Sequence, residues 1–179
     1  LPLTDRSLLK NLYLCPSYGN LIYKWDKGFK LIYKARDMRQ EDKEYIYRAV
    51  EEIPWEEFGI KKVYGDQVED KGTSISIDCL GKDVPDDVKK AWDPEKQKRQ
   101  IIKDGLDKIF KDKFDVYATG RNTVDIVAKN NTKADNTVKL AEILKVPLKD
   151  IVYTGDEFTP HGNDYPMLAL DEIQINMTT

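Results

Sequence analysis

A change of hydrophobic repeat along the chain limits its fold more than any other feature. From residue 61 apolar and polar side chains alternate, which predicts an antiparallel sheet with one wet face. The C-terminal end instead runs strand, helix, strand, the order of a parallel α/β sheet. Two architectures within 179 residues predict a domain inserted into another. The alternating residues are Ser74, Ser76 and Asp78 on one face and Ile75, Ile77 and Cys79 on the other.

Shorter patterns define the other elements of the first half. Residues 12–35 read as three strands, and the last two are joined by a hairpin turn at Asp26-Lys27-Gly28. Residues 40–51 read as a helix that ends before Pro54, because apolar residues recur there at helical spacing. These residues are Tyr45, Ile46, Val50 and Ile53.

The second half contains two predicted helices and four strands. Asp93-Pro94-Glu95 predicts a helix start with Asp93 as its cap. A second helix is predicted over 134–144. The strands are predicted at 114–120, 123–129, 150–154 and 172–176. The predicted buried residues of the first helix are Ile101, Ile102, Leu106, Ile109 and Phe110, and those of the second are Val138, Leu140, Ala141 and Leu144.

Composition excludes several classes of protein. No run approaches the ~18 apolar residues of a membrane span. The 29 basic and 32 acidic residues nearly balance, so the chain as a whole is not drawn to nucleic acid or to an anionic membrane. The two cysteines and single histidine, Cys15, Cys79 and His161, argue against a disulfide scaffold and a Cys/His zinc site. With no export signal, the expected compartment is the cytoplasm.

The segment 151–168 is the most specific stretch of the sequence. A buried strand there ends in Gly-Asp-Glu, which places carboxylates at the edge where open α/β sheets bind ligands. The acids Asp156, Glu157 and Asp164 fall within one loop, and such a cluster suits Mg²⁺, which in turn holds phosphoryl groups. A solvated acidic loop is an equally good interpretation of the spacing alone.

Lys133 lies just ahead of the second predicted helix. A cation is disfavoured at that end of a helix, because the dipole there favours anions. The conflict disappears if Lys133 points at a phosphate. An ordinary surface lysine is the alternative.

Lys133 followed by Gly155-Asp156 and Asn163-Asp164 resembles the haloacid-dehalogenase-like superfamily of phosphotransferases. The longer form GDEFTPHGNDY is similar to subfamily IIB, in particular to eukaryotic-type phosphomannomutases and their bacterial relatives. The resemblance covers nearly the whole chain. It implies an α/β fold in which a partial Rossmannoid parallel core carries an inserted α+β cap of antiparallel sheet and helices. The implied parts are a core segment at 1–35, the cap at 36–128 and a second core segment at 129–179.

The resemblance also implies roles for individual residues. Lys133, Asp156 and Asp164 are expected to be catalytic, and Asp156, Glu157 and Asp164 to hold Mg²⁺. The substrate-binding residues of the cap are expected to be Lys71, Lys82, Lys89, Thr123 and Asp125. The three lysines stand where the mutases have arginines, and a lysine offers a point charge instead of a planar pair of donors.

One family motif is absent from the sequence. The nucleophile of the superfamily is the first Asp of Asp-x-Asp-x-Thr/Val, and no such motif occurs in the 179 residues. Without it the chain lacks a covalent acceptor, so it is not expected to turn over as written. Loss of the central strand that carries the motif would also leave neighbouring strands unpaired. We therefore expect that a separate N-terminal segment, or another chain, fills this place.

Three functions remain open from the sequence. The first is a Mg²⁺-dependent phosphotransferase that acts on a sugar phosphate through an aspartyl-phosphate, as a phosphomannomutase does. The second is a sugar-phosphate phosphatase, and the third is a catalytically inactive fragment or binding module. The expected partner is a phosphorylated sugar, with no nucleic acid and no membrane, and a homodimer through the cap is possible.

Overall fold

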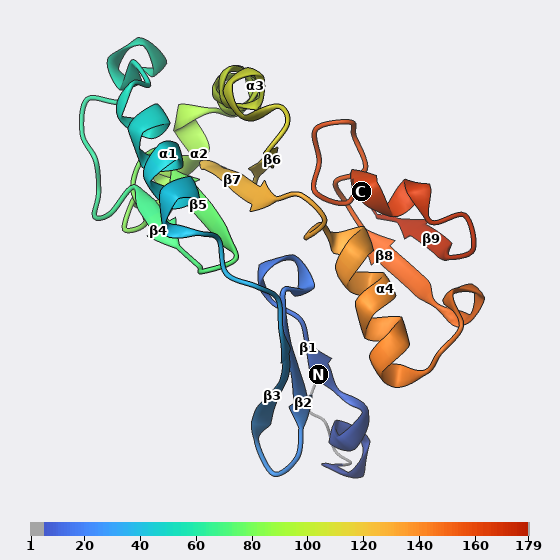
Figure 1. Cartoon of the computed structure of the whole chain (residues 1–179). Coiled ribbons are helices and arrows are strands. Elements are labelled where there is room, and N and C mark those ends of the chain that lie inside the picture. Colours follow the sequence, from blue (N-terminus) through green and yellow to red (C-terminus); the bar gives the residue numbers. More distant parts are fainter. Residues whose placement is uncertain (1–5, 179) are drawn as a thin grey trace.

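The computed structural model describes residues 6–178, and its strands form three separate groups (Figure 1). Two of the groups are antiparallel sheets and the third is a parallel pair. This arrangement confirms the α/β fold predicted from the change of repeat, with an antiparallel layer inserted between parts of a core. No helix in the described part of the chain is long and apolar enough to cross a membrane.

The first group is an antiparallel meander near the N-terminus. Its strands pair in the order β1-β2-β3, as the hairpin pattern predicts. The turn between β2 and β3 uses positive φ at Lys27 (55°) and Gly28 (152°). Two short 3₁₀ helices precede and interrupt the sheet. The elements are η1 (Arg6–Asn11), β1 (Tyr13–Leu14), η2 (Ser17–Gly19), β2 (Leu21–Trp25) and β3 (Phe29–Lys34).

The second group is the four-stranded sheet of the cap, with the order β4-β5-β7-β6 and antiparallel pairing throughout. Ile126 of β7 lies opposite Ile75 of β5 and Val116 of β6, and all three are buried beneath the helices. The strands are β4 (Val68–Asp70), β5 (Ser74–Asp78), β6 (Phe114–Thr119) and β7 (Thr123–Ala128). The helices are α1 (Gln40–Glu51), η3 (Trp55–Phe58), α2 (Asp86–Trp92) and α3 (Gln97–Phe110).

Two predictions for α3 are wrong in detail. The helix begins at Gln97, not at Pro94, although the Asp93 carboxylate still accepts the backbone N–H groups of Lys98 and Arg99. Ile101 and Ile109 are 60% and 47% exposed, because the helix packs on the sheet through a narrower stripe. That stripe consists of Ile102, Leu106 and Phe110.

The third group is the parallel pair β8 (Val152–Gly155) and β9 (Gln174–Met177), which lies beside α4 (Lys133–Leu144) in Figure 1. The 3₁₀ helices η4 (Leu148–Asp150) and η5 (Tyr165–Ala169) lie between them in sequence. Its buried apolar cluster is small and consists of Ala134, Met167 and Ile173. Of the predicted inward residues of α4, Ala141 is buried, whereas Val138, Leu140 and Leu144 are half-buried.

Candidate functional site

Asp164 is the centre of a polar cluster at the carboxyl end of β8. It is 1% exposed, and its Oδ1 accepts hydrogen bonds from Lys133 Nζ and Tyr153 Oη, each at 2.5 Å. Its Oδ2 accepts the backbone N–H groups of Asp156 (3.1 Å) and Glu157 (3.0 Å). Burial alone would raise the pKa of Asp164, but these donors outweigh it and lower that pKa. Asp164 is therefore ionised, and its contacts with the Asp156 and Glu157 amides hold the acidic loop (residues 156–164) in this conformation.

Two glycines allow this loop to close. A Cβ on Gly155 would lie 2.6 Å from Asp164 Oδ2, and one on Gly162 would lie 2.0 Å from the Glu157 carbonyl oxygen. The Asp164 N–H also donates to that carbonyl, at 3.1 Å. Any larger side chain at either glycine would push the loop off its carboxylate.

Lys133 is the first residue of α4, directly after a capping box formed by Thr132 and Asp135. Its ammonium group donates to Asp164 and to Asn163 Oδ1 (2.9 Å), so the predicted conflict with the helix dipole is resolved by a fixed carboxylate. The side chain is 28% exposed and lines a cavity of about 210 Å³ with Tyr18 and Tyr153. Lys133 thus presents an oriented positive charge to this cavity.

Tyr18 connects the N-terminal segment to the cap. Its hydroxyl donates to Asp125 Oδ2 at 2.7 Å, and burial followed by the Asp125 charge raises the pKa of Tyr18. Tyr18 has a φ of 64° between Ser17 (51°) and Gly19 (85°), a run of positive φ that strains non-glycine residues. A Cβ on Gly19 would lie 2.8 Å from Asn136 Cβ, so α4 holds this strained loop in place.

The predicted substrate residues Thr123 and Asp125 are both engaged within the cap. Thr123 Oγ1 donates to Asp78 Oδ1 at 2.7 Å. Asp125 is 7% exposed, and besides Tyr18 it accepts Thr119 Oγ1 at 3.0 Å and Ser76 Oγ. Their role toward a sugar stays a prediction.

The structure does not bring the three predicted cap lysines together. Lys71 and Lys82 lie beyond opposite ends of β5, a five-residue strand about 17 Å long. Each is paired with a local acid, Lys71 with Glu69 (3.4 Å) and Lys82 with Asp66 (2.6 Å). Lys89 lies in α2. A single phosphate cannot contact all three.

Lys89 instead lines a basic cavity of about 290 Å³ beside the turn between β6 and β7. Arg99 is buried in its wall, where the guanidinium donates to Asp93 Oδ2 (3.0 Å) and to the Thr119 carbonyl (3.1 Å). The charged residues that line this basic cavity are Lys89, Lys90, Asp93, Lys96, Arg99 and Arg121. Basic groups outnumber the single acid, which suits an anionic ligand.

Two contacts join the cap helix α3 and the turn before it to the acidic loop. Lys96 forms an ion pair with Glu157 at 2.6 Å, and Lys103 Nζ lies 3.3 Å from His161 Nδ1. The basic cavity and the acidic loop are therefore neighbours. These contacts give His161 a partner that its isolated position in the sequence did not indicate.

The three predicted Mg²⁺ ligands do not form a complete metal site by themselves. Asp164 is occupied by Lys133 and Tyr153, and Glu157 by Lys96. Asp156 is exposed, and its carboxylate has no partner among residues 6–178. Within the same residues no three Asp, Glu, His or Cys side chains converge as a metal site. Bound Mg²⁺ would need further oxygen ligands beside Asp156, so its binding stays a prediction.

Sequence reasoning missed Tyr18, Tyr153, Lys96 and Arg121. Tyr153 could have been found from the sequence, because the alternation along β8 places it on the same side as Gly155, beside the acidic loop. Tyr18 could not have been found in this way, since its contact with Asp125 spans 107 residues and no local pattern predicts its backbone conformation.

Comparison with known proteins gives the following matches. A family model described as haloacid dehalogenase-like hydrolase matches residues 6–179. Among solved structures, an N-terminally truncated, IMP-bound IMP-nucleotidase of Plasmodium falciparum superposes with a TM-score of 0.61 at 19% identity, over 98% of this chain and 46% of that one. This chain thus spans less than half of that protein. No curated protein matches in sequence.

Two bacterial structures are similar over more of their length. A haloacid dehalogenase-like hydrolase of Bacteroides thetaiotaomicron has a TM-score of 0.51 at 13% identity, over 93% of this chain and 71% of that one. One of B. subtilis has a TM-score of 0.52 at 13% identity, over 88% and 66%. At these identities the likeness concerns the fold alone.

Proposed function

Because this chain belongs to the haloacid dehalogenase-like hydrolase family, we propose that it forms the cap and C-terminal core of a phosphatase that acts on a phosphorylated sugar. The observation that carries the proposal is the ammonium group of Lys133, fixed by Asp164 and Asn163 at the carboxyl end of β8. A preorganised cation at that edge stabilises the charge of a transferring phosphoryl group.

The substrate's remaining anionic or polar part would contact the basic cavity. Lys96 links that cavity to the acidic loop through Glu157, so a ligand can reach both regions. Arg121 and Lys89 are the most suitable contacts, because Arg99 is already occupied by Asp93 and backbone carbonyls. Asp156 supplies an exposed carboxylate on the side of the loop, and in the full-length enzyme we expect it to contribute to a Mg²⁺ requirement.

A phosphatase is favoured over a phosphomannomutase by the dispersion of Lys71, Lys82 and Lys89. A mutase that exchanges phosphate between two positions must hold a second phosphate firmly in the cap. Lys71 and Lys82 are instead neutralised by local acids at opposite ends of β5. A phosphatase transfers the phosphoryl group to water, and this reaction needs no second phosphate site in the cap.

The covalent acceptor of this chemistry would come from an additional strand. β8 pairs with β9 on one edge only among the described residues, and Val152 on it is 56% exposed. A free parallel edge beside the cavity of Lys133 offers unpaired backbone groups to such a strand. A separately supplied segment that carries an aspartate is the partner we propose there.

A homodimer through the cap is a further proposal for the whole protein. α1 and α3 form an apolar groove of about 300 Å³ whose lining includes Ile53, Ile101 and Ile109. Ile101 and Ile109 are the exposed residues that the sequence pattern had placed in the core. Burial against a second copy would explain their apolar character.

The test uses the full-length protein and a panel of phosphosugars, with phosphate release and sugar-phosphate isomerisation measured in parallel. We expect phosphate release to dominate and to depend on Mg²⁺. Asp156→Ala should abolish turnover while the circular dichroism spectrum is unchanged. Isomerisation as the main reaction would establish a mutase, and binding of phosphosugar without any turnover would leave only a binding module.

A second measurement tests the basic cavity. Arg121→Gln and Lys89→Gln should raise KM for the phosphosugar about tenfold and leave KM for p-nitrophenyl phosphate nearly unchanged, because the small ester has no distal group. Lys71→Gln is the matched control outside the cavity and should affect neither substrate. An equal effect of Arg121→Gln on both substrates would argue against this placement of the substrate.

A further inference from the structure

A second cavity of the cap lies on the other side of α2 from the basic cavity. It has a volume of about 530 Å³, within the range of small-molecule sites, and lies among residues 59–64, Leu80, α2 and Lys98. Asp87, Val88, Ala91 and Trp92 of α2 line it, whereas Lys89 and Lys90 line the basic cavity. The two cavities are therefore separate, and the larger one has no part in the function proposed above.

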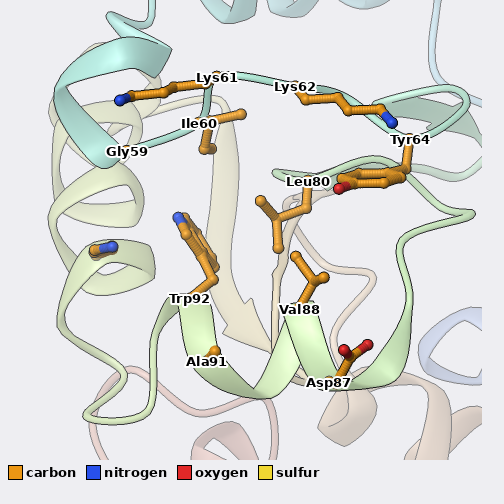
Figure 2. A pocket seen from close by; sticks show the side chains of 11 residues that line it. Gly59, Ile60, Lys61, Lys62, Tyr64, Leu80, Asp87, Val88, Ala91 and Trp92 are labelled. Atoms are coloured by element: carbon orange, nitrogen blue, oxygen red, sulfur yellow. The ribbon is translucent and has the colours of Figure 1, made fainter.

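The floor and walls of this cavity are apolar and aromatic. Figure 2 shows the rings of Trp92 and Tyr64 on two sides, with Leu80 and Val88 between them. Trp92 is 7% exposed and Leu80 is 4% exposed. Two aromatic walls over an aliphatic floor suit a planar ring, because ring stacking adds to the gain from burying apolar area.

The rim of the cavity is positively charged. Lys61 and Lys62 lie along one side of it in Figure 2, and Lys98 Nζ lies 5.5 Å from the centre of the Trp92 ring. None of these three ammonium groups has an ion-pair partner within the described residues, and Asp87 is the single acid of the lining. Lys62 Nζ lies 4.6 Å from the centre of the Tyr64 ring. Cations beside both aromatic walls suit a ligand that carries both a ring and an anion.

The walls are held in place by backbone contacts. Trp92 Nε1 donates to the Phe58 carbonyl at 2.9 Å, which fixes the indole. The Tyr64 N–H donates to the Leu80 carbonyl at 2.8 Å, and the Tyr64 carbonyl accepts the Asp83 N–H at 2.9 Å. A Cβ on Gly81 would lie 2.2 Å from the Tyr64 carbonyl oxygen, so the two segments touch directly. The cavity is preformed, which lowers the cost of binding.

We propose that this cavity binds a planar organic phosphate of mononucleotide size. The ring would lie on Leu80 and Val88 between Trp92 and Tyr64, and the phosphate would contact Lys62 on the Tyr64 side of the rim, whereas Lys98 lies on the Trp92 side. The three lysines and one acid of the lining leave a net excess of two positive charges, which a dianionic phosphate matches better than a neutral ring or a simple carboxylate does. All residues that line this cavity belong to the cap, so binding of the ligand can be measured separately from catalysis.

The experiment is a titration of the full chain with AMP, adenosine, ribose 5-phosphate and inorganic phosphate, followed by the indole N–H signals of the three tryptophans and by calorimetry. We expect AMP to shift the Trp92 signal and to bind more tightly than any of the three fragments. Lys62→Gln should weaken AMP about three- to tenfold, the effect of one partly exposed charge, and leave adenosine unchanged, whereas Lys98→Gln on the Trp92 side should have a smaller effect on AMP.

Two control variants separate the possible outcomes. Lys149→Gln, outside both cavities, should leave AMP affinity unchanged. Lys90→Gln changes the basic cavity and should also leave it unchanged. The proposal is overturned if AMP does not move the Trp92 signal at millimolar concentration, or if Lys90→Gln weakens AMP while Lys62→Gln does not. It is equally overturned if adenosine or inorganic phosphate alone binds as tightly as AMP.

Discussion

The cap and the C-terminal segment differ in how completely they bury their apolar side chains. In the cap, the inner face of the sheet and three helices enclose a continuous core, in which Ile75, Ile77 and Ile126 are fully buried. The C-terminal segment has a small cluster, and Val152 and Met177 on its two strands are 56% and 64% exposed. The cap therefore encloses an apolar core of its own, whereas the parallel pair leaves apolar side chains uncovered by the described residues.

The same contrast holds for charged groups. The cap buries a whole ion pair, Asp93–Arg99, with both side chains at most 4% exposed. The C-terminal segment buries only one partner of its central pair, since Asp164 is 1% exposed and Lys133 is 28% exposed. A fully enclosed pair fixes structure, whereas a half-open pair leaves a charge available to a ligand.

Asp93→Ala is expected to lower the free energy of unfolding more than any other substitution proposed for the two regions. It would leave the Arg99 guanidinium buried without its carboxylate, and the loss of one partner of a buried pair costs about 3 to 5 kcal/mol. Urea unfolding followed by circular dichroism measures the change. Asp171→Ala, at an exposed residue, is the control and should change the free energy of unfolding by less than about 0.5 kcal/mol.

A double variant sharpens this prediction. Asp93→Leu with Arg99→Met should be less destabilising than Asp93→Ala, because no unpaired charge remains buried. If the double variant were the more unstable one, the hydrogen bonds from Asp93 to α3 would matter more than the ion pair.

Ile126→Ala is expected to cause the second largest loss of stability. It removes three carbon atoms from the centre of the cap sheet, where Ile126 is 0% exposed, and should lower the free energy of unfolding by about 3 kcal/mol. Val152→Ala in β8 is the matched change in the C-terminal segment and should cost less than about 0.5 kcal/mol, since Val152 is mostly exposed. Equal costs would mean that Val152 is covered in solution and would remove the contrast between the two regions.

The regular parts of both regions could be predicted from the sequence because their patterns are local. The alternation around Ser76 correctly placed Ile75, Ile77 and Cys79 on a buried face. The prediction that the opposite face is wet was wrong, because Ser74 and Ser76 are each 1% exposed and Ser76 donates to the buried Asp125. The acidic loop was located because Gly155, Asp156 and Asp164 are close together in sequence. Asp93 was recognised as a capping residue, although α3 begins three residues later than predicted.

The remaining features depend on tertiary contacts that no local pattern contains. Ile101 and Ile102 are adjacent on a helix, so they cannot face the same sheet, and only Ile102 does. The short helix α2 lacks a full apolar repeat and was missed, yet it separates the two cavities of the cap. The position of Lys89 relative to Lys71 and Lys82 likewise follows from the fold and not from spacing.

Acid should weaken the cap through Asp93. Burial alone would raise the pKa of Asp93, but the Lys98 and Arg99 amides and the Arg99 guanidinium outweigh it and lower that pKa. The folded state thus holds fewer protons than the unfolded state, so this stabilisation is complete above the usual carboxyl pKa of about 3.9 and is lost as the pH falls through the lower folded value.

The measurement is urea unfolding of the wild type and Asp93→Asn between about pH 6 and about pH 3. The difference in unfolding free energy between them should be largest near neutral pH and should shrink in acid. A difference that stays constant over this range would show that the charge of Asp93 contributes nothing. The effect is smaller than that of Asp93→Ala, because a protonated carboxyl still accepts hydrogen bonds.

The smallest expected effect concerns the junction between the N-terminal segment and the cap. Tyr18→Phe removes the hydroxyl that donates to Asp125, and loss of one hydrogen bond to a charged group costs about 1 to 2 kcal/mol. Tyr23→Phe in β2 is the control, since its hydroxyl makes no hydrogen bond within residues 6–178, and it should be nearly neutral. A cycle that combines Tyr18→Phe with Asp125→Asn should give a coupling energy of about 1 kcal/mol. A coupling near zero would mean that the hydrogen bond between Tyr18 and Asp125 does not join the N-terminal segment to the cap.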